Sequence, residues 1–213
     1  MSKDQILITV VVVLLLLTTI WGVWYQTNYN KAVRDTQRII TDLDLLRLFE
    51  KQPGGLLSAD MIAERTDLSK SEVNARLSSL HTGGLLRAGM NPTGTKYFYE
   101  LRTELEEVPG LKLSGSAFLT IEDLQQIFIA YDYKVSPHDL MVTTGLPWKV
   151  LSREMQYFRK EGMVEVVLID RPGDAAKQYV LLEAYHAEKL DLNQAEAINE
   201  KVKKVLFDEQ LLV

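Results

Sequence analysis

The sequence predicts an α+β protein that is mainly α-helical, with an N-terminal transmembrane helix, two similar domains in tandem and a C-terminal helix. Three observations predict this class. Residues 6–24 hold no charged side chain, the chain resembles itself at a shift of 78 residues, and apolar residues recur at helical spacing near the end. The 213 residues are enough for two small domains beside one membrane span.

Residues 1–24 are predicted to form a retained transmembrane helix. The 19 uncharged residues cover a bilayer core of about 30 Å at about 1.5 Å per residue. Trp21, Trp24 and Tyr25 stand at the end of the stretch, where aromatic rings favour the headgroup region. The alternative, a cleaved signal peptide, would need small residues at that point.

The flanking charges predict how this span would be oriented. Lys31, Arg34 and Arg38 follow it, whereas only Lys3 precedes it. This excess predicts a single-pass protein of the plasma (inner) membrane, with the N-terminus outside and the bulk of the chain in the cytoplasm. The absence of cysteine agrees with a reducing compartment.

The rest of the chain is predicted to contain a stalk, two domains, a linker and a final helix. A helical stalk occupies residues 25–40, and the domains occupy residues 41–103 and 118–186. Acidic residues, proline, glycine and serine interrupt all periodicity in the linker, residues 104–117.

The C-terminal helix is predicted over residues 187–213. Ala195, Ile198, Val202 and Val205 recur at heptad-like spacing in it. This stripe has two interpretations, because it suits packing on the second domain and equally suits the seam of a homodimer or a contact with a protein partner.

The internal repeat aligns residues 43–86 with residues 121–164 without a gap, and the helix signals recur with it. Each copy is predicted to contain helix, helix, turn, helix and hairpin in this order. Ser58 and Ser136 are suitable N-caps for the second helix of each copy. Ser69 with Glu72 forms a capping box at the start of the first copy's third helix.

Each third helix is predicted to end at a glycine and to be followed by a hairpin. Gly84 and Gly162 stand where a C′ glycine ends a helix. The first hairpin is expected to pair residues 85–88 with 97–101, and the second to pair residues 163–169 with 179–183.

This pattern resembles the winged helix-turn-helix superfamily, twice. The resemblance lies in the turns at residues 66–69 and 144–147, the third helices over 69–81 and 147–161, and the two hairpin wings. It implies that the third helices read the major groove of DNA and that the wings touch its backbone or minor groove. The DNA-binding candidates carried over in this way are Lys70, Ser71, Asn74, Arg76, Lys96, Lys149, Arg153, Gln156, Arg159, Lys160, Arg171 and Lys177.

Charge leaves two functions open. Residues 31–105 carry 11 basic and 10 acidic side chains, whereas residues 118–186 carry 7 basic and 10 acidic ones. The third helix of the second copy carries four basic residues and two acidic ones, Glu154 and Glu161. This local excess of positive charge favours a membrane-tethered DNA-binding protein that acts as a transcriptional regulator. The acidic balance favours the alternative, a membrane-anchored protein-interaction scaffold that uses tandem winged helices as the ESCRT-II complex does.

Trp148 is expected to be a core or interface anchor and not a base-stacking residue. An enzyme is not expected, and the sequence predicts no catalytic, cofactor-binding or metal-binding residues. The histidines His81, His138 and His186 share no ligand spacing, and the chain lacks a glycine-rich loop that could bind phosphates.

Overall fold

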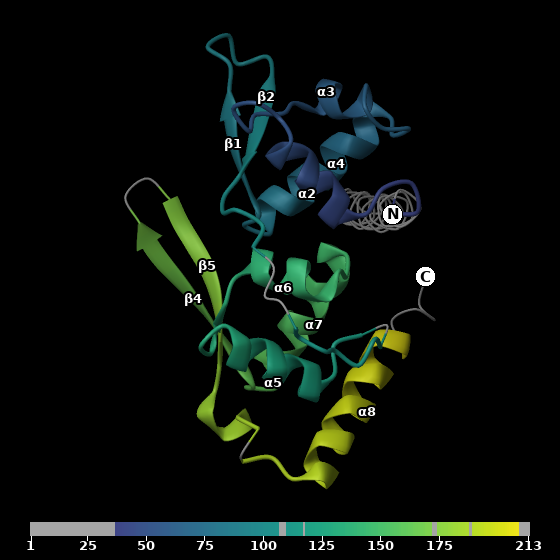
Figure 1. Ribbon diagram of the computed structural model, residues 1–213, viewed down its shortest axis with the longest axis vertical. Coiled ribbons are helices and arrows are strands. Elements are labelled where there is room, and N and C mark those ends of the chain that lie inside the picture. The colour runs from purple at the N-terminus through teal and green to yellow at the C-terminus, as the bar shows by residue number, and fades with distance from the viewer. Residues whose placement is uncertain (1–36, 107–109, 117, 172–173, 188, 209–213) are drawn as a thin grey trace, which may run out of the picture.

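The computed structural model describes residues 37–208, apart from residues 107–109, 117, 172–173 and 188. Figure 1 shows two groups of elements, one above the other along the long axis of the molecule. The first unit, residues 42–101, consists of α2 (Asp42–Glu50), α3 (Ala59–Ala63), α4 (Lys70–Thr82), β1 (Leu86–Met90) and β2 (Tyr97–Leu101). The second unit, residues 121–185, consists of α5 (Ile121–Ala130), β3 (Lys134–Val135), α6 (Pro137–Thr144), α7 (Trp148–Lys160), β4 (Val164–Arg171), β5 (Asp174–Leu181) and the 3-10 turn η1 (Glu183–Tyr185).

The helices of the first unit begin where short polar side chains can cap them. Thr41 accepts a hydrogen bond from the Asp44 amide at the start of α2, and Ser58 caps α3. At α4 the predicted capping box is confirmed, because the Ser69 amide donates to the Glu72 carboxylate at 2.8 Å and Ser69 Oγ accepts from the Glu72 amide. These caps fix where each helix starts, and therefore which of its faces meets the core.

The core of the first unit lies between its three helices and its hairpin. Leu45, Phe49, Ile62, Leu77 and Leu80 are buried there with at most 1% of their surface exposed. The strands β1 and β2 pair antiparallel, and Leu57 adds a short bridge to the β2 residue at position 99. The hairpin is thus fastened to the helices on one side, while its other side faces solvent.

The second unit repeats this order of elements. Helices α4 and α7 both have 13 residues and begin 78 residues apart, which confirms the register predicted for them. Ser136 caps α6, with Pro137 as its first residue. The sheet has the order β3–β5–β4, with β3 in the place of the Leu57 bridge. The description of the two units as winged-helix domains with the predicted boundaries stays a prediction.

The second hairpin is longer than expected. Strand β5 begins at Asp174 and not at residue 179, and Arg171 is paired with Asp174 at the end of the ladder. The expectation was wrong because Pro172 and Gly173 were interpreted as part of a wide loop, whereas the strands continue to both sides of these two residues.

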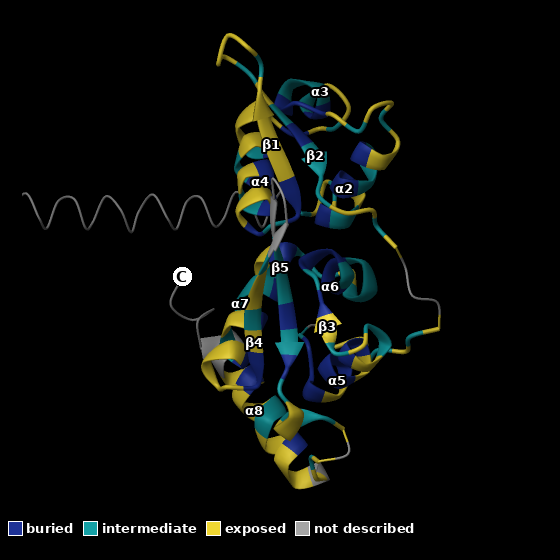
Figure 2. Ribbon diagram, turned by 90° about the vertical axis from the view of Figure 1, so that its left-hand side faces the viewer, coloured by how far each residue is buried: buried dark blue, intermediate teal, exposed yellow. Residues whose placement is uncertain are grey.

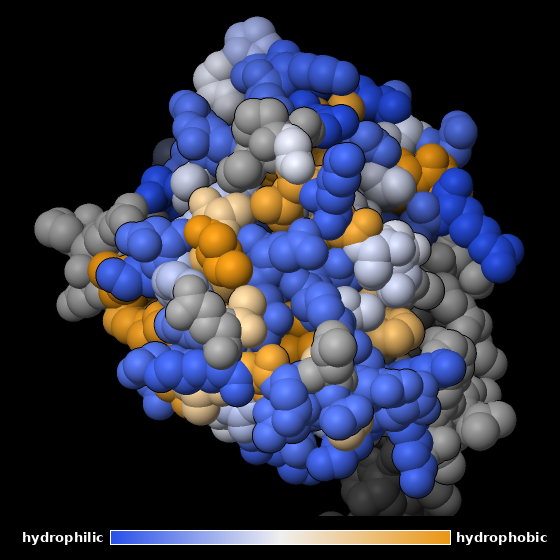
Figure 3. All heavy atoms as spheres, turned by 60° about the horizontal axis from the view of Figure 1, so that its bottom comes forward, coloured by the Kyte–Doolittle hydropathy of each residue, from blue (hydrophilic) through white to orange (hydrophobic). Residues whose placement is uncertain are grey.

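The C-terminal helix α8 (Leu192–Asp208) packs on the second unit. Ala195 and Val202 are buried, and Asn199 accepts a hydrogen bond from the first amide of α5, that of Ile121, at 2.8 Å. The end of the molecule that carries α5 and α8 is mainly hydrophilic in Figure 3, with apolar residues scattered over it. This agrees with the expected packing on the second unit, and a homodimer seam or a contact with a protein partner stays a prediction.

The predicted membrane localisation is contradicted. Within the part of the chain that the structure describes, no helix is both long and apolar enough to cross a membrane. The longest, α8, has 17 residues and carries several lysines, whereas a span needs about 20 predominantly apolar residues. The expected transmembrane helix, residues 1–24, and nearly all of the expected stalk lie outside the described residues.

Candidate nucleic-acid interface

The exposed face of α4 is polar and carries three of the predicted DNA-binding residues. Val73, Leu77 and Leu80 are buried on its inner side. The outer side presents exposed side chains, namely Lys70, Ser71, Asn74 and Ser78. Figure 2 shows the exposed residues of α4 and α7 on the same side of the molecule.

Arg76 does not belong to this surface, so its prediction as a DNA-binding residue was wrong. Only 1% of it is exposed, and its Nε donates to the Asp42 carboxylate at 3.0 Å. Its guanidinium also donates to the Ile40 carbonyl at 2.7 Å and to the Gln37 side chain. Arginine tolerates this position because its five donors can be satisfied by partners that surround it.

Lys70 and Lys96 share one acidic partner. Lys70 lies 2.6 Å and Lys96 3.3 Å from the carboxylate of Asp60. Their hydrogen bonds, that of Lys70 first, hold the pKa of Asp60 below its usual range. Asp60 therefore links the start of α4 to the residue just before β2, and its negative charge offsets part of the positive charge of Lys70 and Lys96.

Helix α7 presents most of its basic residues to solvent, but the structure changes which acids oppose them. Lys149, Arg159 and Lys160 are exposed, and Arg153 is half-buried and engaged with other groups. Glu154, which the sequence places beside them, is fully buried and accepts a hydrogen bond from the Leu119 amide at 3.1 Å. Glu161, which follows the last residue of α7, is exposed and thus remains as the acidic residue that opposes the basic residues of this helix.

Trp148 anchors the contact between the two units, which agrees with the expectation of a core or interface role. It is 4% exposed, and its backbone N–H donates to the Asp42 carboxylate of the first unit at 3.0 Å. Helix α7 has no side-chain cap of its own, so Asp42 supplies one. Nearby, the imidazole of His138 donates to the Leu85 carbonyl at 2.8 Å, and burial lowers the pKa of His138.

Gly83, at the end of α4, leaves the space that the Trp148 indole occupies. A Cβ at this position would lie 2.2 Å from Trp148 Nε1 and 2.4 Å from Cε2. We expect Gly83→Ala to lower the free energy of unfolding by about 1–3 kcal/mol, because a rigid ring in a packed contact must shift. Chemical denaturation measures this effect. Gly89→Ala is the matched control, since a Cβ there meets nothing within 4 Å; equal stability of the two variants would contradict the contact.

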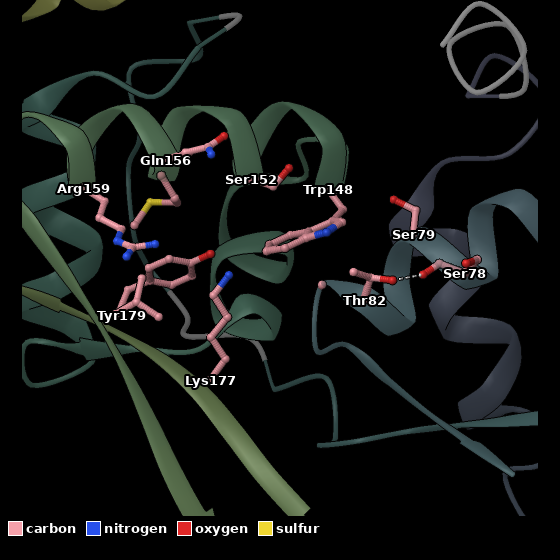
Figure 4. A pocket seen from close by; sticks show the side chains of 12 residues that line it. Ser78, Ser79, Thr82, Trp148, Ser152, Gln156, Arg159, Lys177 and Tyr179 are labelled. Carbon is pink, nitrogen blue, oxygen red and sulfur yellow. Dashed lines mark hydrogen bonds between the residues drawn. The ribbon is translucent and has the colours of Figure 1, made fainter. Parts of the chain in front are cut away.

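A groove of about 450 Å³ lies where the two units meet. Its walls come from the C-terminal half of α4 and from α7, and its floor comes from β4 and β5. The residues that line it are Ser78, Ser79, Thr82, Gly83, Trp148, Ser152, Met155, Gln156, Arg159, Val166, Lys177 and Tyr179. Figure 4 shows the side chains of both helices and of the β5 strand arranged around this space.

Lys177, one of the predicted DNA-binding residues, lies in this groove. It is half-buried, with its Nζ 4.8 Å from the ring centroid of Tyr179 and 5.8 Å from that of Trp148. Burial lowers the pKa of Lys177, and the charge of Arg159 lowers it further. The side chain of Arg171, the other candidate of this hairpin, lies outside the described part of the chain.

The histidines are engaged in local packing. The ring of His81 is 2.9 Å from the Leu86 carbonyl, and His186 stacks on Tyr133 at 4.0 Å between centroids. Within the described residues no group of three or more His, Asp or Glu side chains could hold a metal ion.

The first unit carries a recognisable family signature. Residues 43–88 match the IclR helix-turn-helix domain. The matched region runs from α2 to β1 and includes the whole of α4, the helix with the exposed polar face. The second unit lies outside the matched region. No curated protein matches the chain.

The sequence did not indicate the groove. The residues that line the groove come from positions as far apart as 78 and 179, and no local sequence motif contains them. The one available signal was Trp148, a large aromatic residue at a helix start.

Proposed function

We propose that this chain is a DNA-binding transcriptional regulator whose α4 lies in the major groove. The observation that carries the proposal is the IclR-type helix-turn-helix match over residues 43–88, in which α4 turns a continuous polar face outwards. An α-helix fits the major groove of DNA, where the base edges present distinct donors and acceptors.

The exposed residues of α4 divide into two kinds. Asn74 can pair with adenine through both atoms of its amide, and Ser71 can donate to or accept from base edges. Lys70, at the helix start, and Lys96, at the start of β2, suit phosphates, because a lysine acts as a point charge towards them. Their shared contact with Asp60 keeps both ammonium groups on one side of the unit.

Helix α7 is proposed to extend the interface. It lies on the same side of the molecule as α4, and its exposed Lys149 and Lys160 can neutralise phosphates beside the first contact. Gln156 and the half-buried Arg153 complete the candidates of this helix. The net charge of −5 makes such concentrated basic positions necessary, because the chain as a whole does not attract DNA.

The test is the binding of DNA by variants of α4. A duplex is first selected from a random-sequence pool with the wild-type chain, and its affinity is measured by fluorescence anisotropy at several salt concentrations. We expect Ser71→Ala with Asn74→Ala to weaken this duplex about tenfold or more, since a base contact contributes about 1–3 kcal/mol. Binding to unselected DNA should change little, because these residues contact bases and not phosphates.

A second variant checks the role of α7 and a third serves as the control. Lys149→Gln with Lys160→Gln should lower the salt slope of log affinity by up to about 0.9 for each phosphate that is no longer neutralised. Lys51→Gln removes an exposed charge at the end of α2, away from both helices, and should leave affinity as it is. If no duplex is enriched, or if the α4 variant binds as tightly as the wild type, the proposal fails.

A further inference from the structure

The groove between the units contains positive charge and lacks negative charge. Twelve of the residues that the structure describes line it, and none of these twelve is an aspartate or a glutamate. Arg159 reaches it from α7, and Lys177 reaches it from β5. Figure 4 shows their end groups near the Tyr179 ring, one on each side of it in this view. An anion entering this space would therefore meet two cations and no repelling carboxylate.

These two cations have no acidic partner of their own. Within the described residues neither Arg159 nor Lys177 forms an ion pair with a carboxylate, and Lys177 rests on aromatic rings instead. Their mutual repulsion and the partial burial of Lys177 both raise the free energy of the empty groove. A bound anion would offset both costs, so the arrangement favours an occupant with negative charge.

The groove also offers neutral donors at the same place. Burial raises the pKa of Tyr179 to about 12, so its hydroxyl keeps its proton and can donate it. The hydroxyl of Tyr179 and the amide of Gln156 form no hydrogen bond with any other described residue, and both border the cavity. Two cations and two such donors are the groups that hold the oxygens of a phosphate.

We propose that the groove between α4 and α7 is a binding site for a phosphate group, held by Arg159 and Lys177 with Tyr179 and Gln156 as hydrogen-bond donors. Two sources share this chemistry. A small phosphorylated molecule fits the volume of about 450 Å³, which lies in the range of small-ligand sites. A backbone phosphate of DNA lying on both helices could also enter, and this source alone rests on the proposed function.

The site has walls from both units, and this gives its occupant an effect on the whole molecule. Ser78 and Thr82 belong to α4, whereas Ser152 and Arg159 belong to α7. A ligand that binds only when both walls are in place stabilises their present arrangement. Because the four groups proposed to hold the phosphate all belong to the second unit, an occupant would fix the spacing between α4 and α7 only where it also contacts the wall formed by Ser78 and Thr82.

The experiment uses the full chain and two probes. Inorganic pyrophosphate is titrated by isothermal calorimetry at constant ionic strength, and a random-sequence duplex is titrated at several salt concentrations. The test variant is Arg159→Gln with Lys177→Gln, and the matched control is Lys134→Gln, an exposed lysine of β3 outside the groove. A charge-keeping variant, Arg159→Lys with Lys177→Arg, separates the loss of charge from a loss of folding, which unfolding curves also monitor.

We expect the test variant to bind one of the two probes at least tenfold more weakly than the wild type does. The control variant and the charge-keeping variant should keep the wild-type affinity for that probe. Loss of pyrophosphate binding assigns the site to a free phosphorylated ligand. An unchanged pyrophosphate titration together with a salt slope lowered by about 0.9–1.8 assigns it to the DNA backbone. If neither probe responds to the test variant, the proposal is wrong. A chain that binds no DNA would contradict the proposed function but would leave the pyrophosphate result to decide this site.

Discussion

Replacing Arg76 by methionine should lower the free energy of unfolding by about 3–5 kcal/mol. Methionine is similar in length to arginine and suits a helix, but the substitution removes the guanidinium donors that face Asp42. The Asp42 carboxylate is 5% exposed and, among the described residues, would keep the Trp148 amide as its hydrogen-bond partner. A buried carboxylate without its counter-ion is far costlier than the removal of one interaction at the surface.

Chemical denaturation of the wild type and three variants checks this expectation. Arg65→Met is the matched control, because Arg65 is exposed and its guanidinium has a hydrogen bond to Gln52. Asp42→Asn combined with Arg76→Met should recover part of the stability, since no charge then stays buried. A single Arg76→Met variant within about 0.5 kcal/mol of the wild type would show that the pair contributes little.

The second large effect should appear in the pH dependence of stability, at Glu154. Burial raises the pKa of this carboxyl to about 7 in the folded chain, and the hydrogen bond from Leu119 opposes only part of this rise. One carboxylate oxygen, Oε1, has no hydrogen-bond partner among the residues that the structure describes. Because the folded pKa is above the unfolded value of 4.5, the folded state binds this proton more tightly. Stability from this group is complete below about pH 4.5 and is lost as the pH rises through about 7.

Glu154→Gln isolates this contribution. Glutamine keeps an oxygen for the Leu119 amide and cannot ionise, so the variant should gain stability relative to the wild type as the pH rises. The gain between about pH 4.5 and 8.5 should be on the order of 3 kcal/mol, because a pKa that is higher by one contributes about 1.4 kcal/mol. Urea denaturation over this pH range measures it, with Glu161→Gln, an exposed residue of the same helix end, as the control. Parallel curves for Glu154→Gln and the wild type would refute the buried-acid interpretation.

The regular elements were predictable because the signals that determine them are local. Ser69 and Glu72 are three residues apart, and Ser136 directly precedes the proline that begins α6. Such caps, together with apolar residues at helical spacing, place α4 and α7 in register without any knowledge of the contacts between them. The packing of α8 on α5 was one of two interpretations of the same stripe, and only its contacts could decide between them.

The charged residues of the candidate interface were harder to place, because their positions depend on distant partners. Arg76 and Asp42 are 34 residues apart, and Arg and Asp are ordinarily exposed, so a helical pattern assigns Arg76 to the surface. Glu154 was assigned to the exposed face for the same reason, although its partner is the Leu119 amide in the segment before α5. Lys177 depends on two aromatic residues from two different elements. Sequence spacing within one element carries none of this information.

The cap that Asp42 provides for α7 has a consequence for the order of folding. An N-cap side chain ordinarily satisfies one of the first amides of a helix, but Pro147 offers no side-chain hydrogen bond. The partner of the Trp148 amide lies 106 residues earlier in the chain and is itself held by Arg76. We therefore expect the start of α7 to be completed after α2 and α4 have come together. The first unit thus supplies a hydrogen-bond acceptor that the first helix turn of α7 needs. We expect the hydrogen bond from the Trp148 amide to Asp42 to form late in the folding reaction.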